Sequence, residues 1–261
     1  MESEPVFKGA IVRPPTPNFA DGLTTSGLGV PDFARAMEQH VRYAEMLARL
    51  GLHVLLAEPD AAFPDATFVE DVAVMTPRGA ILMRPGAASR RGEVVSLKPA
   101  IAGSVAITAA IEPPGTVDGG DVCAAGDTYF IGLSSRTDER GARQLEAILK
   151  REGFAVRLVD VQPFPGLLHL KSGMAWLGGR RVLAATALAP HPAFAGYEVI
   201  VVPEDETYVA NAVAIDGRVL LADGYPKTRR AIEALGLEVV PLDMSEFRKM
   251  DGGLSCLSLR F

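Results

Sequence analysis

The thiol of Cys256 is the most distinctive chemical group in this sequence. Cys256 follows the pair Gly252-Gly253, which lets a backbone approach another group closely, and it opens a short apolar stretch that is expected to be a strand. Packing as a small buried hydrophobe is the alternative for a free cysteine. We interpret Cys256 as a nucleophile, since a thiolate is the strongest ordinary nucleophile at neutral pH.

A thiolate in this role needs a proton donor for the leaving group, and His169 can supply the proton. An acid beside the imidazole would fix its orientation, and Asp118 is the candidate for that task. The remaining histidines are expected to be structural: His40, His53 and His191. The sequence therefore offers a thiol, an imidazole and an acid for covalent catalysis.

Several carboxylates accompany these groups: Asp65, Glu70, Asp71, Asp118 and Asp121. Acids around a nucleophile repel a carboxylate or an acyl phosphate, whereas they hold a planar guanidinium with paired hydrogen bonds. Attack of the thiolate on a guanidinium carbon, with the histidine protonating the departing nitrogen and then activating water, would be hydrolysis through a covalent adduct. Metal binding is the competing interpretation, but the sequence has no CxxC, HxxxH or HExxH spacing.

Composition and charge exclude several other classes of protein. The 261 residues are 48% hydrophobic and 22% charged, with a formal net charge of −6, so nucleic acid and anionic membranes are not expected partners. Residues 1–4 are acidic where a signal peptide would be basic, and no apolar run reaches the roughly 18 residues of a membrane span. Cys123 and Cys256 suit a reducing compartment. These features predict a cytoplasmic protein.

A repeated unit organises the chain: an apolar strand, a segment that usually forms a helix, and a second apolar strand. The first strands are predicted at residues 9–14, 79–85, 128–133, 181–185 and 218–222, and the second strands at 53–57, 104–107, 155–159, 197–202 and 237–242. Helices are predicted in the first, third and fifth units, at residues 32–50, 138–152 and 228–235.

Four of the first strands follow a hairpin from another short strand, at residues 71–75, 121–125, 172–176 and 211–215. The first unit lacks this opening strand, and residues 256–259 can take its place beside residues 7–12. The sequence therefore predicts a single catalytic domain over residues 1–261 with an α/β fold. The fold is a five-bladed α/β propeller of ββαβ-type repeats around a central pocket, closed by pairing of the C-terminal strand with the N-terminal strand. An α/β sandwich is the alternative.

Equivalent positions of such a ring converge on its axis. The residues that open a strand at the same point of their unit are Asp71, Asp121, Ser172, Asn211 and Cys256. Residues just before these positions should gather in one largely pre-formed pocket, which would bring His169 and Asp118 to Cys256.

Five segments, in order along the chain, closely resemble the dimethylarginine dimethylaminohydrolase family of the guanidine-modifying pentein superfamily. They are FVEDVAV (68–74), RPGA with SRR (84–91), GTVDGGD (115–121), LHLKS (168–172) and DGGLSC (251–256). The resemblance runs from Phe7 to Phe261 and implies a five-bladed propeller. It also implies hydrolysis of dimethylarginine and monomethylarginine to citrulline and dimethylamine or methylamine, through a covalent thiouronium intermediate and without a cofactor or metal.

The resemblance implies a role for each site residue. Cys256 would be the nucleophile, His169 the general acid and base, and Asp118 its partner. The substrate-binding residues would be Leu23, Asp65, Glu70, Asp71, Arg90, Arg136 and Met250. Among these, the Glu70-Asp71 pair would clamp the guanidinium, and Asp65 with the carbonyls of Leu23 and Met250 would bind the α-amino group. Arg90 and Arg136 would anchor the α-carboxylate from the side of the pocket opposite the acids.

Three further features follow from the resemblance. The family carries Glu or Asp at position 118, and the shorter Asp118 should place the imidazole slightly differently. Asn211-Ala212 stands where relatives often have Asn-Cys, which should not affect the mechanism. Residues 20–29 are rich in glycine and small polar side chains and fit a mobile lid. Arg91 has no motif role and is expected on a solvated face.

Two other functions remain as alternatives. The first is an arginine or agmatine deiminase of the same superfamily, although arginine deiminases resemble longer chains and agmatine has no carboxylate for Arg90 and Arg136. The second, ranked lower, is a non-catalytic ribosome-binding propeller, which would not need Cys256, His169 and the acids together. The preference among methylarginines and the oligomeric state, a homodimer included, are left open.

Overall fold

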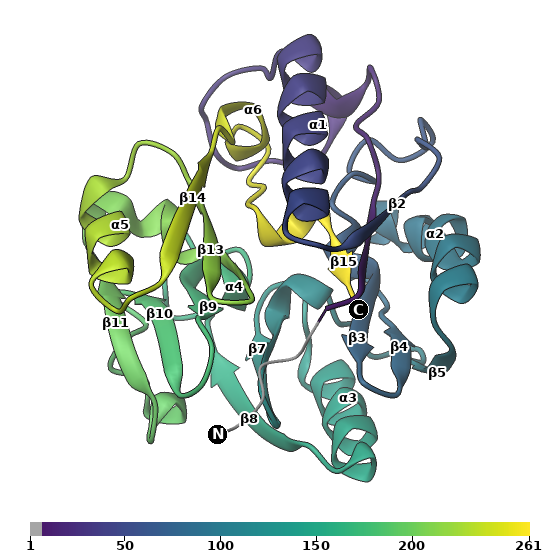
Figure 1. Cartoon of the computed structure of the whole chain (residues 1–261). Coiled ribbons are helices and arrows are strands. Elements are labelled where there is room, and N and C mark those ends of the chain that lie inside the picture. The colour runs from purple at the N-terminus through teal and green to yellow at the C-terminus, as the bar shows by residue number, and fades with distance from the viewer. Residues whose placement is uncertain (1–6) are drawn as a thin grey trace.

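The computed structural model describes residues 7–261, so the acidic residues 1–4 lie outside the described range. The described chain forms five separate sheets of three strands each, arranged in a ring, with the longer helices on its outer side (Figure 1). The predicted five-bladed α/β propeller is therefore confirmed. The prediction of one domain over residues 1–261 stays a prediction.

Each sheet follows one plan, in which the middle strand pairs antiparallel with one neighbour and parallel with the other. This is the predicted ββαβ order. The five sheets are β15 (Leu259–Arg260), β1 (Gly9–Val12) and β2 (His53–Leu56); β3 (Ala73–Thr76), β4 (Gly79–Leu82) and β5 (Ile107–Ala110); β6 (Val122–Ala125), β7 (Thr128–Leu133) and β8 (Ala155–Asp160); β9 (Met174–Trp176), β10 (Arg181–Ala185) and β11 (Glu198–Val202); and β12 (Val213–Ile215), β13 (Arg218–Ala222) and β14 (Glu238–Leu242).

The two ends of the described chain close the first blade. β15 pairs antiparallel with β1, with Ala10 opposite Arg260 and Ile11 opposite Leu259. The predicted closure is therefore confirmed, but its extent is corrected. Cys256 does not begin the strand, because it lies in a 3₁₀ turn, Ser255–Leu257, that precedes β15.

The other opening strands need the same correction, since each starts one or two residues later than predicted. A short helical turn comes before each of them: the 3₁₀ turns Val69–Val72, Gly119–Asp121 and Glu204–Ala210, and α4 (Leu170–Gly173). These turns use their polar side chains for bonds between blades. For example, Asp71 Oδ1 accepts from the Gly120 N–H (2.8 Å) and Asp121 Oδ1 from the Leu170 N–H (2.9 Å). The ring axis is thus lined by turns.

The helices on the outer side cross from the middle strand of a blade to its third strand. They are α1 (Phe33–Arg49), α2 (Arg91–Ser104), α3 (Glu139–Glu152) and α5 (Pro226–Glu233), and a further helix, α6 (Ser245–Arg248), precedes the Cys256 turn. Helices α1, α3 and α5 confirm the three predicted helices. Asp32 and Asp138 cap α1 and α3 by accepting from N–H groups of their first turns, and Gly153 ends α3 with a φ of +97°.

Helix α2 was not predicted, and its presence moves the next strand. Its apolar residues do not follow one face, and Pro99 lies inside it, so the usual helix pattern is weak. Because α2 extends to Ser104, β5 begins at Ile107 rather than at the predicted residue 104. The fourth blade has a 3₁₀ turn, Pro192–Phe194, on its crossover.

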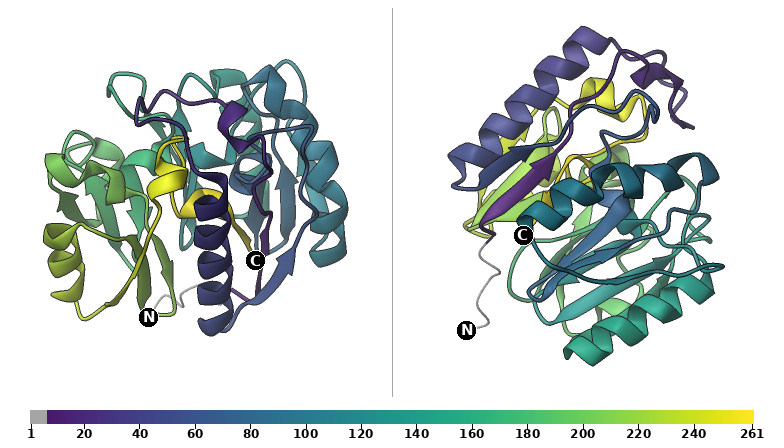
Figure 2. Two further views of the ribbon diagram at one scale, coloured as in Figure 1. Left: turned by 90° about the horizontal axis from the view of Figure 1, so that it is seen from above. Right: turned by 90° about the vertical axis from the view of Figure 1, so that its right-hand side faces the viewer.

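The hydrophobic core lies between the outer helices and the sheets. Fully buried side chains on the inner faces of the helices make it, such as Tyr43 and Leu47 of α1 and Leu145 and Leu149 of α3. The two views in Figure 2 show these helices packed along the outside of the sheets. This apolar packing surrounds the ring, whereas turns with polar side chains such as Asp71 and Asp121 line one end of its axis. No helix among residues 7–261 is long and apolar enough to cross a membrane.

Candidate active site

Two neighbouring cavities meet at Cys256 on one side of the ring. The larger, of about 510 Å³, is lined by residues from several blades, including Glu70, His169, Lys171 and Cys256. The smaller, of about 30 Å³, shares His169 and Cys256 with it. The structure thus brings the predicted nucleophile and the predicted acid–base to one site, as the convergence argument required.

His169 is held by a buried acid. Its Nε2 lies 3.0 Å from Oδ2 of Asp118, which is completely buried and accepts a second hydrogen bond at Oδ1 from the Gly86 N–H (2.8 Å). The residue before α4 is His169, so the start of this short helix fixes the position of its backbone. The predicted pairing of His169 with Asp118 is present, and the aspartate side chain is long enough to make it.

The environment of His169 favours the protonated imidazole. Burial lowers its pKa, but the negative charge of Asp71, the hydrogen bond to Asp118 and the charge of Asp121 outweigh that effect and raise the pKa to about 9. The imidazolium is therefore the prevailing form at neutral pH. It can donate a proton to a departing amine without first taking one up.

Cys256 lies deep in the site and keeps part of its surface open to the cavities. Burial and the negative charges of Glu70 and Asp71 raise the pKa of its thiol to about 12, although a hydrogen bond from the Gly253 N–H to Sγ (3.4 Å) opposes that shift. The resting group is therefore a thiol. A cation bound against these acids would offset their charge and favour the thiolate.

The two acids of the predicted guanidinium clamp already have partners. Glu70 accepts from Lys171 Nζ (2.5 Å) and from the Ser255 hydroxyl (2.7 Å). Asp71 accepts from Arg90 Nη1 (2.5 Å) and from the Gly120 N–H. Both carboxylates are buried, so these bonds hold them in place within the site. A guanidinium would have to use their remaining lone pairs or displace a partner.

The predicted carboxylate anchors differ in environment. Arg90 and Arg136 both line the smaller cavity, but Arg90 bonds directly to Asp71 and does not lie opposite the acids. That part of the prediction is wrong for Arg90, because its guanidinium is buried and needs a counter-charge. Arg136 forms no ion pair with any residue in the range 7–261, and its charge is free to meet a ligand.

The residues predicted to bind an α-amino group lie around the same small cavity. Asp65 is buried, and both of its carboxylate oxygens lie 3.1 Å from the Leu23 N–H. Burial raises the pKa of Asp65, and the positive charge of Arg90 opposes that shift. Leu23 and Met250 line the cavity beside Asp65, so the structure brings all seven predicted substrate-binding residues to the site or its wall.

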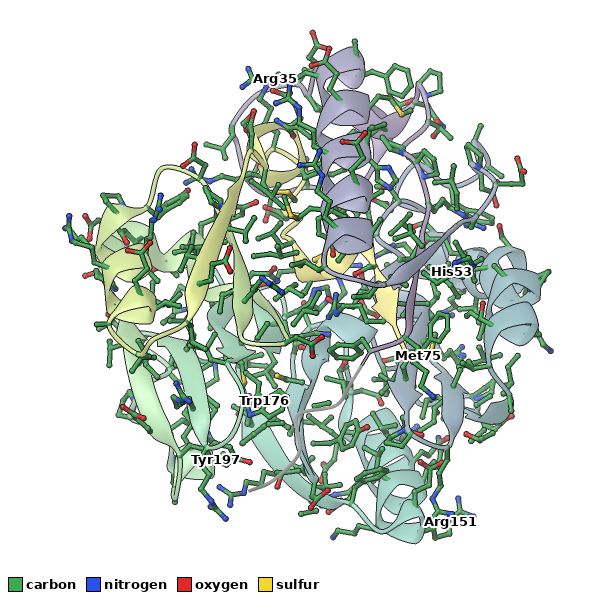
Figure 3. The ribbon with its side chains drawn as sticks, in the orientation of Figure 1. Arg35, His53, Met75, Arg151, Trp176 and Tyr197 are labelled. Carbon is green, nitrogen blue, oxygen red and sulfur yellow. The ribbon has the colours of Figure 1, made fainter. Side chains whose placement is uncertain are left out.

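A third cavity, of about 130 Å³, lies along the axis among the opening strands β3, β6, β9, β12 and β15. Glu70 and Lys171 line both this axial cavity and the larger active-site cavity, so their ion pair forms the boundary between the two. Met75 and Trp176 also line the axial cavity, and Figure 3 shows them nearer the middle of the ring than Arg151. The ion pair of Glu70 and Lys171 therefore separates the active-site cavity from the axial cavity.

The predicted lid is tied to the segment that carries the nucleophile. Asp251 Oδ2 accepts from both the N–H (2.5 Å) and the hydroxyl (3.0 Å) of Thr25, and the Lys249 carbonyl accepts from the hydroxyls of Thr24 and Ser26 (2.8 and 2.6 Å). Asp251 holds this position with a φ of +56°, a left-handed conformation that costs energy for a residue other than glycine. The motion of the lid itself stays a prediction.

Replacing Asp251 by glycine is expected to loosen the lid without straining the chain. Glycine suits the φ of +56°, so the variant loses the bonds to Thr25 but gains an easier backbone. A hydrogen bond to a charged group contributes about 1.5–3 kcal/mol, and we expect KM to rise by about tenfold with a smaller change in kcat. Amide exchange at residues 20–29 should quicken. Asp251→Asn is the control, since it keeps a neutral acceptor. Unchanged exchange and KM in the glycine variant would contradict the role of Asp251 in holding the lid.

Sequence reasoning missed three polar residues that hold the site together. Lys171 and Ser255 bind Glu70, and Glu93 binds Arg90. Lys171 and Ser255 each lie within two residues of a predicted catalytic residue, and Glu93 follows Arg90 at the i+3 spacing of a helical pair. These spacings were visible, but the partners come from other blades or from a helix that was not predicted.

One cluster in the described chain could offer several donors to a cation. The nearest polar atoms of Asp71, Asp118 and His169 all lie within 4.8 Å of one another. Arg90, Gly86 and Gly120 already engage the two carboxylates, and the imidazole Nε2 faces Asp118. The arrangement fits an acid–imidazole pair for proton transfer better than a set of metal ligands.

A ring of five three-stranded blades with a thiol, an imidazole and buried carboxylates at its axis defines a guanidine-modifying enzyme of the pentein superfamily. No family model matches the chain. It is 44% identical over 260 residues to an N(G),N(G)-dimethylarginine dimethylaminohydrolase of Pseudomonas aeruginosa, which covers 98% of this chain and 100% of the relative. A relative of the same name from Streptomyces coelicolor is 37% identical over 255 residues, 97% of this chain and 96% of that protein.

A solved structure agrees with these relatives. It is a cysteine-to-serine mutant of the Pseudomonas aeruginosa enzyme complexed with citrulline. It superposes with a TM-score of 0.94 at 43% identity over 98% of this chain and 100% of the other. This chain belongs to the dimethylarginine dimethylaminohydrolase family, which confirms the resemblance found in its sequence.

Proposed function

We propose that this protein hydrolyses dimethylarginine and monomethylarginine to citrulline and dimethylamine or methylamine. The observation that carries the proposal is the meeting, at Cys256, of a protonated imidazole, two buried acids and a cavity with the free cation Arg136. Family membership supports it, and a family structure is complexed with citrulline. The function is that of a hydrolase acting on the C–N bond of a linear amidine.

The first half of the reaction forms a covalent adduct. The cationic guanidinium binds beside Glu70 and Asp71, its charge offsets theirs, and the Cys256 thiol gives up its proton to solvent. The thiolate attacks the central guanidinium carbon and forms a C–S bond. His169 then donates its proton to the methylated nitrogen as the C–N bond breaks, and the methylamine departs from a thiouronium on Cys256.

The second half consumes water. His169, now neutral, takes a proton from a water molecule as the water oxygen attacks the thiouronium carbon. Collapse of the tetrahedral adduct breaks the C–S bond, expels the Cys256 thiolate and leaves citrulline, and one proton is released. Asp118 keeps the imidazole oriented in both halves through its 3.0 Å contact. The protein's own groups supply every step, so the proposal needs no cofactor or metal.

The remaining residues determine which guanidine binds. Asp65 with the carbonyls of Leu23 and Met250 would hold the α-amino group, and Arg136 with Arg90 would hold the α-carboxylate. Arg136, which has no ion-pair partner among residues 7–261, favours a free amino acid over agmatine, which has no carboxylate. Two unpaired cysteines support a reducing, cytoplasmic location within the same proposal. The partner is a small molecule, and a homodimer stays a prediction.

Citrulline release by the wild type and by Arg136→Ala tests the substrate assignment. Dimethylarginine, monomethylarginine, arginine and agmatine are compared side by side, and the methylarginines should turn over best. A charge-assisted bond contributes about 1.5–3 kcal/mol, so Arg136→Ala should lower kcat/KM for the amino acids by at least about tenfold. Agmatine turnover should change little. Equal losses on all substrates would show that Arg136 supports the fold instead, and faster turnover of agmatine by the wild type would contradict the proposal.

A further inference from the structure

Glu93 lies in the first turn of α2 and binds the guanidinium of Arg90. Its carboxylate accepts from Arg90 Nε at Oε1 (3.0 Å) and from Nη2 at Oε2 (2.8 Å), which is a two-point contact along one edge of the guanidinium. Glu93 is only 1% exposed and Arg90 5%. Solvent screening is therefore small, and the pair fixes the plane in which Arg90 lies.

The opposite edge of Arg90 faces the active site. Nη1 donates to Asp71 Oδ2 (2.5 Å), and Nη2 also donates to the Phe68 carbonyl (3.1 Å). A guanidinium has five N–H groups. Two of them bind Glu93, one binds Asp71 and one binds Phe68, which leaves one N–H on Nη1 without a partner among the described residues. Arg90 itself lines the small cavity. By fixing the plane of the guanidinium, Glu93 thus determines the direction of the remaining Nη1 N–H of Arg90.

The charges continue from Asp71 to the catalytic pair. The nearest polar atoms of Asp71, His169 and Asp118 lie within 4.8 Å of one another, and all three residues are buried. Glu93, Arg90, Asp71 and His169 therefore form a row of alternating charge that starts outside the cavities and ends at the imidazole. Each member stabilises the charge of the next one.

We propose that Glu93 is a positioning residue of this site: by holding Arg90 against Asp71, it sets both the orientation of the carboxylate anchor and the net charge that His169 faces. The first half of this inference rests on the proposed function, because it concerns a substrate carboxylate. The second half concerns the free protein and can be measured without a substrate.

The direction of the effect follows from the sign of the charges. With Glu93 ionised, Arg90 is shared between two carboxylates and neutralises Asp71 only in part, so Asp71 stabilises the imidazolium of His169. Without that charge, Arg90 acts more fully on Asp71 and His169, and the imidazolium becomes less stable. Glu93 faces Arg90, Asp65, Asp71 and Arg13, while His169 faces Asp71, Asp118 and Asp121. Burial raises the pKa of Glu93 to about 7, although Arg90 opposes it.

The test is the titration of His169 in the free protein, followed by NMR of the imidazole. Glu93→Gln removes the charge and keeps the size of the side chain. The midpoint of His169 is expected to fall by about one pH unit, because the loss of the Glu93 charge lets Arg90 act more fully on Asp71 and His169 and makes the imidazolium less stable. Glu206→Gln is the matched control. Glu206 is another buried glutamate, 4% exposed, that accepts from the N–H groups of Lys227 and Thr228 in α5. It should leave the midpoint unchanged.

Two further measurements complete the design. In the wild type, the His169 signal should show a second, smaller inflection where the Glu93 carboxyl titrates, which requires no variant to fold. Glu93→Asp keeps the charge but is too short for both bonds, so it should leave the His169 midpoint in place and lower kcat/KM for amino-acid substrates by about tenfold.

A folded Glu93→Gln variant with the wild-type His169 midpoint would overturn the inference, as would a Glu93 titration that leaves the wild-type His169 signal unmoved. Both results concern the protein without substrate. They are therefore distinct from a failure of the proposed function, which would appear as absent citrulline release with the His169 coupling intact.

Discussion

Cys256→Ser is expected to abolish turnover and leave the fold intact. Serine fits the same 3₁₀ turn and can accept from the Gly253 N–H, so the local structure should survive. The alcohol, however, has a far higher pKa than a thiol, and Glu70 and Asp71 disfavour an anion at this position even for the cysteine. A bound guanidinium cannot make up that difference. We expect a loss of at least about 10⁴-fold in kcat, of the kind seen when a catalytic nucleophile is removed.

The measurement is citrulline release together with mass spectrometry of the quenched reaction. The wild type should show a mass increase on the peptide that carries Cys256, and the serine variant should show none. Cys123→Ala is the control, because this second thiol is buried, lines the axial cavity and has no role in the proposed mechanism. Substantial activity in Cys256→Ser, or an adduct on Cys123, would disprove the thiolate mechanism.

The ring architecture could be predicted because the same pattern occurs several times in one chain. A single apolar stretch such as residues 218–222 suits many folds, but five such stretches, each followed by a second apolar strand and four preceded by a hairpin, leave few alternatives. The missing opener of the first blade then had one available partner, and β15 beside β1 supplies it. Helices with clear capping residues, such as α3 after Asp138, could also be predicted, because the caps mark where these helices begin and end.

What sequence patterns could not show was the local geometry at the axis. Asp71, Asp121 and Cys256 look like the first residues of strands, yet each lies in a helical turn whose bonds go to another blade. Such bonds join residues far apart in the sequence, and periodicity carries no information about them. Helix α2 was missed because its apolar residues are not one-sided.

The identities of the site residues were easier to anticipate than their interactions. Arg90 was expected as a carboxylate anchor opposite the acids, but it is buried against them, and a buried guanidinium requires counter-charges. Asp71 and Glu93 supply them. Glu70 likewise needs Lys171. The sequence contains these charges but does not show which of them pair, so the division between free and engaged groups came only from the structure.

Replacing His169 by alanine or glycine is expected to lower kcat by about 10²–10⁴-fold, the usual contribution of general acid–base catalysis. In the proposed mechanism the imidazolium protonates the departing amine and the neutral imidazole activates water, so both halves of the reaction would lose their proton carrier. The thiol stays in place, because the Gly253 N–H and the 3₁₀ turn hold Cys256 without help from the imidazole. Alkylation of Cys256 should therefore persist, although more slowly, since a nearby positive charge is gone.

A structural role for His169 would give a different result. Its removal leaves Asp71, Asp118 and Asp121 buried without the imidazolium, and some loss of stability is expected for that reason alone. Chemical rescue separates the two roles. His169→Gly leaves room for a free imidazole, and added imidazole should restore part of the activity if the lost function is proton transfer. His191→Ala, at a half-buried histidine on the outer crossover of the fourth blade, should keep full activity. Loss of alkylation at Cys256 together with a lowered melting temperature and no rescue would mean that His169 serves the fold, and the proton transfers would need another group.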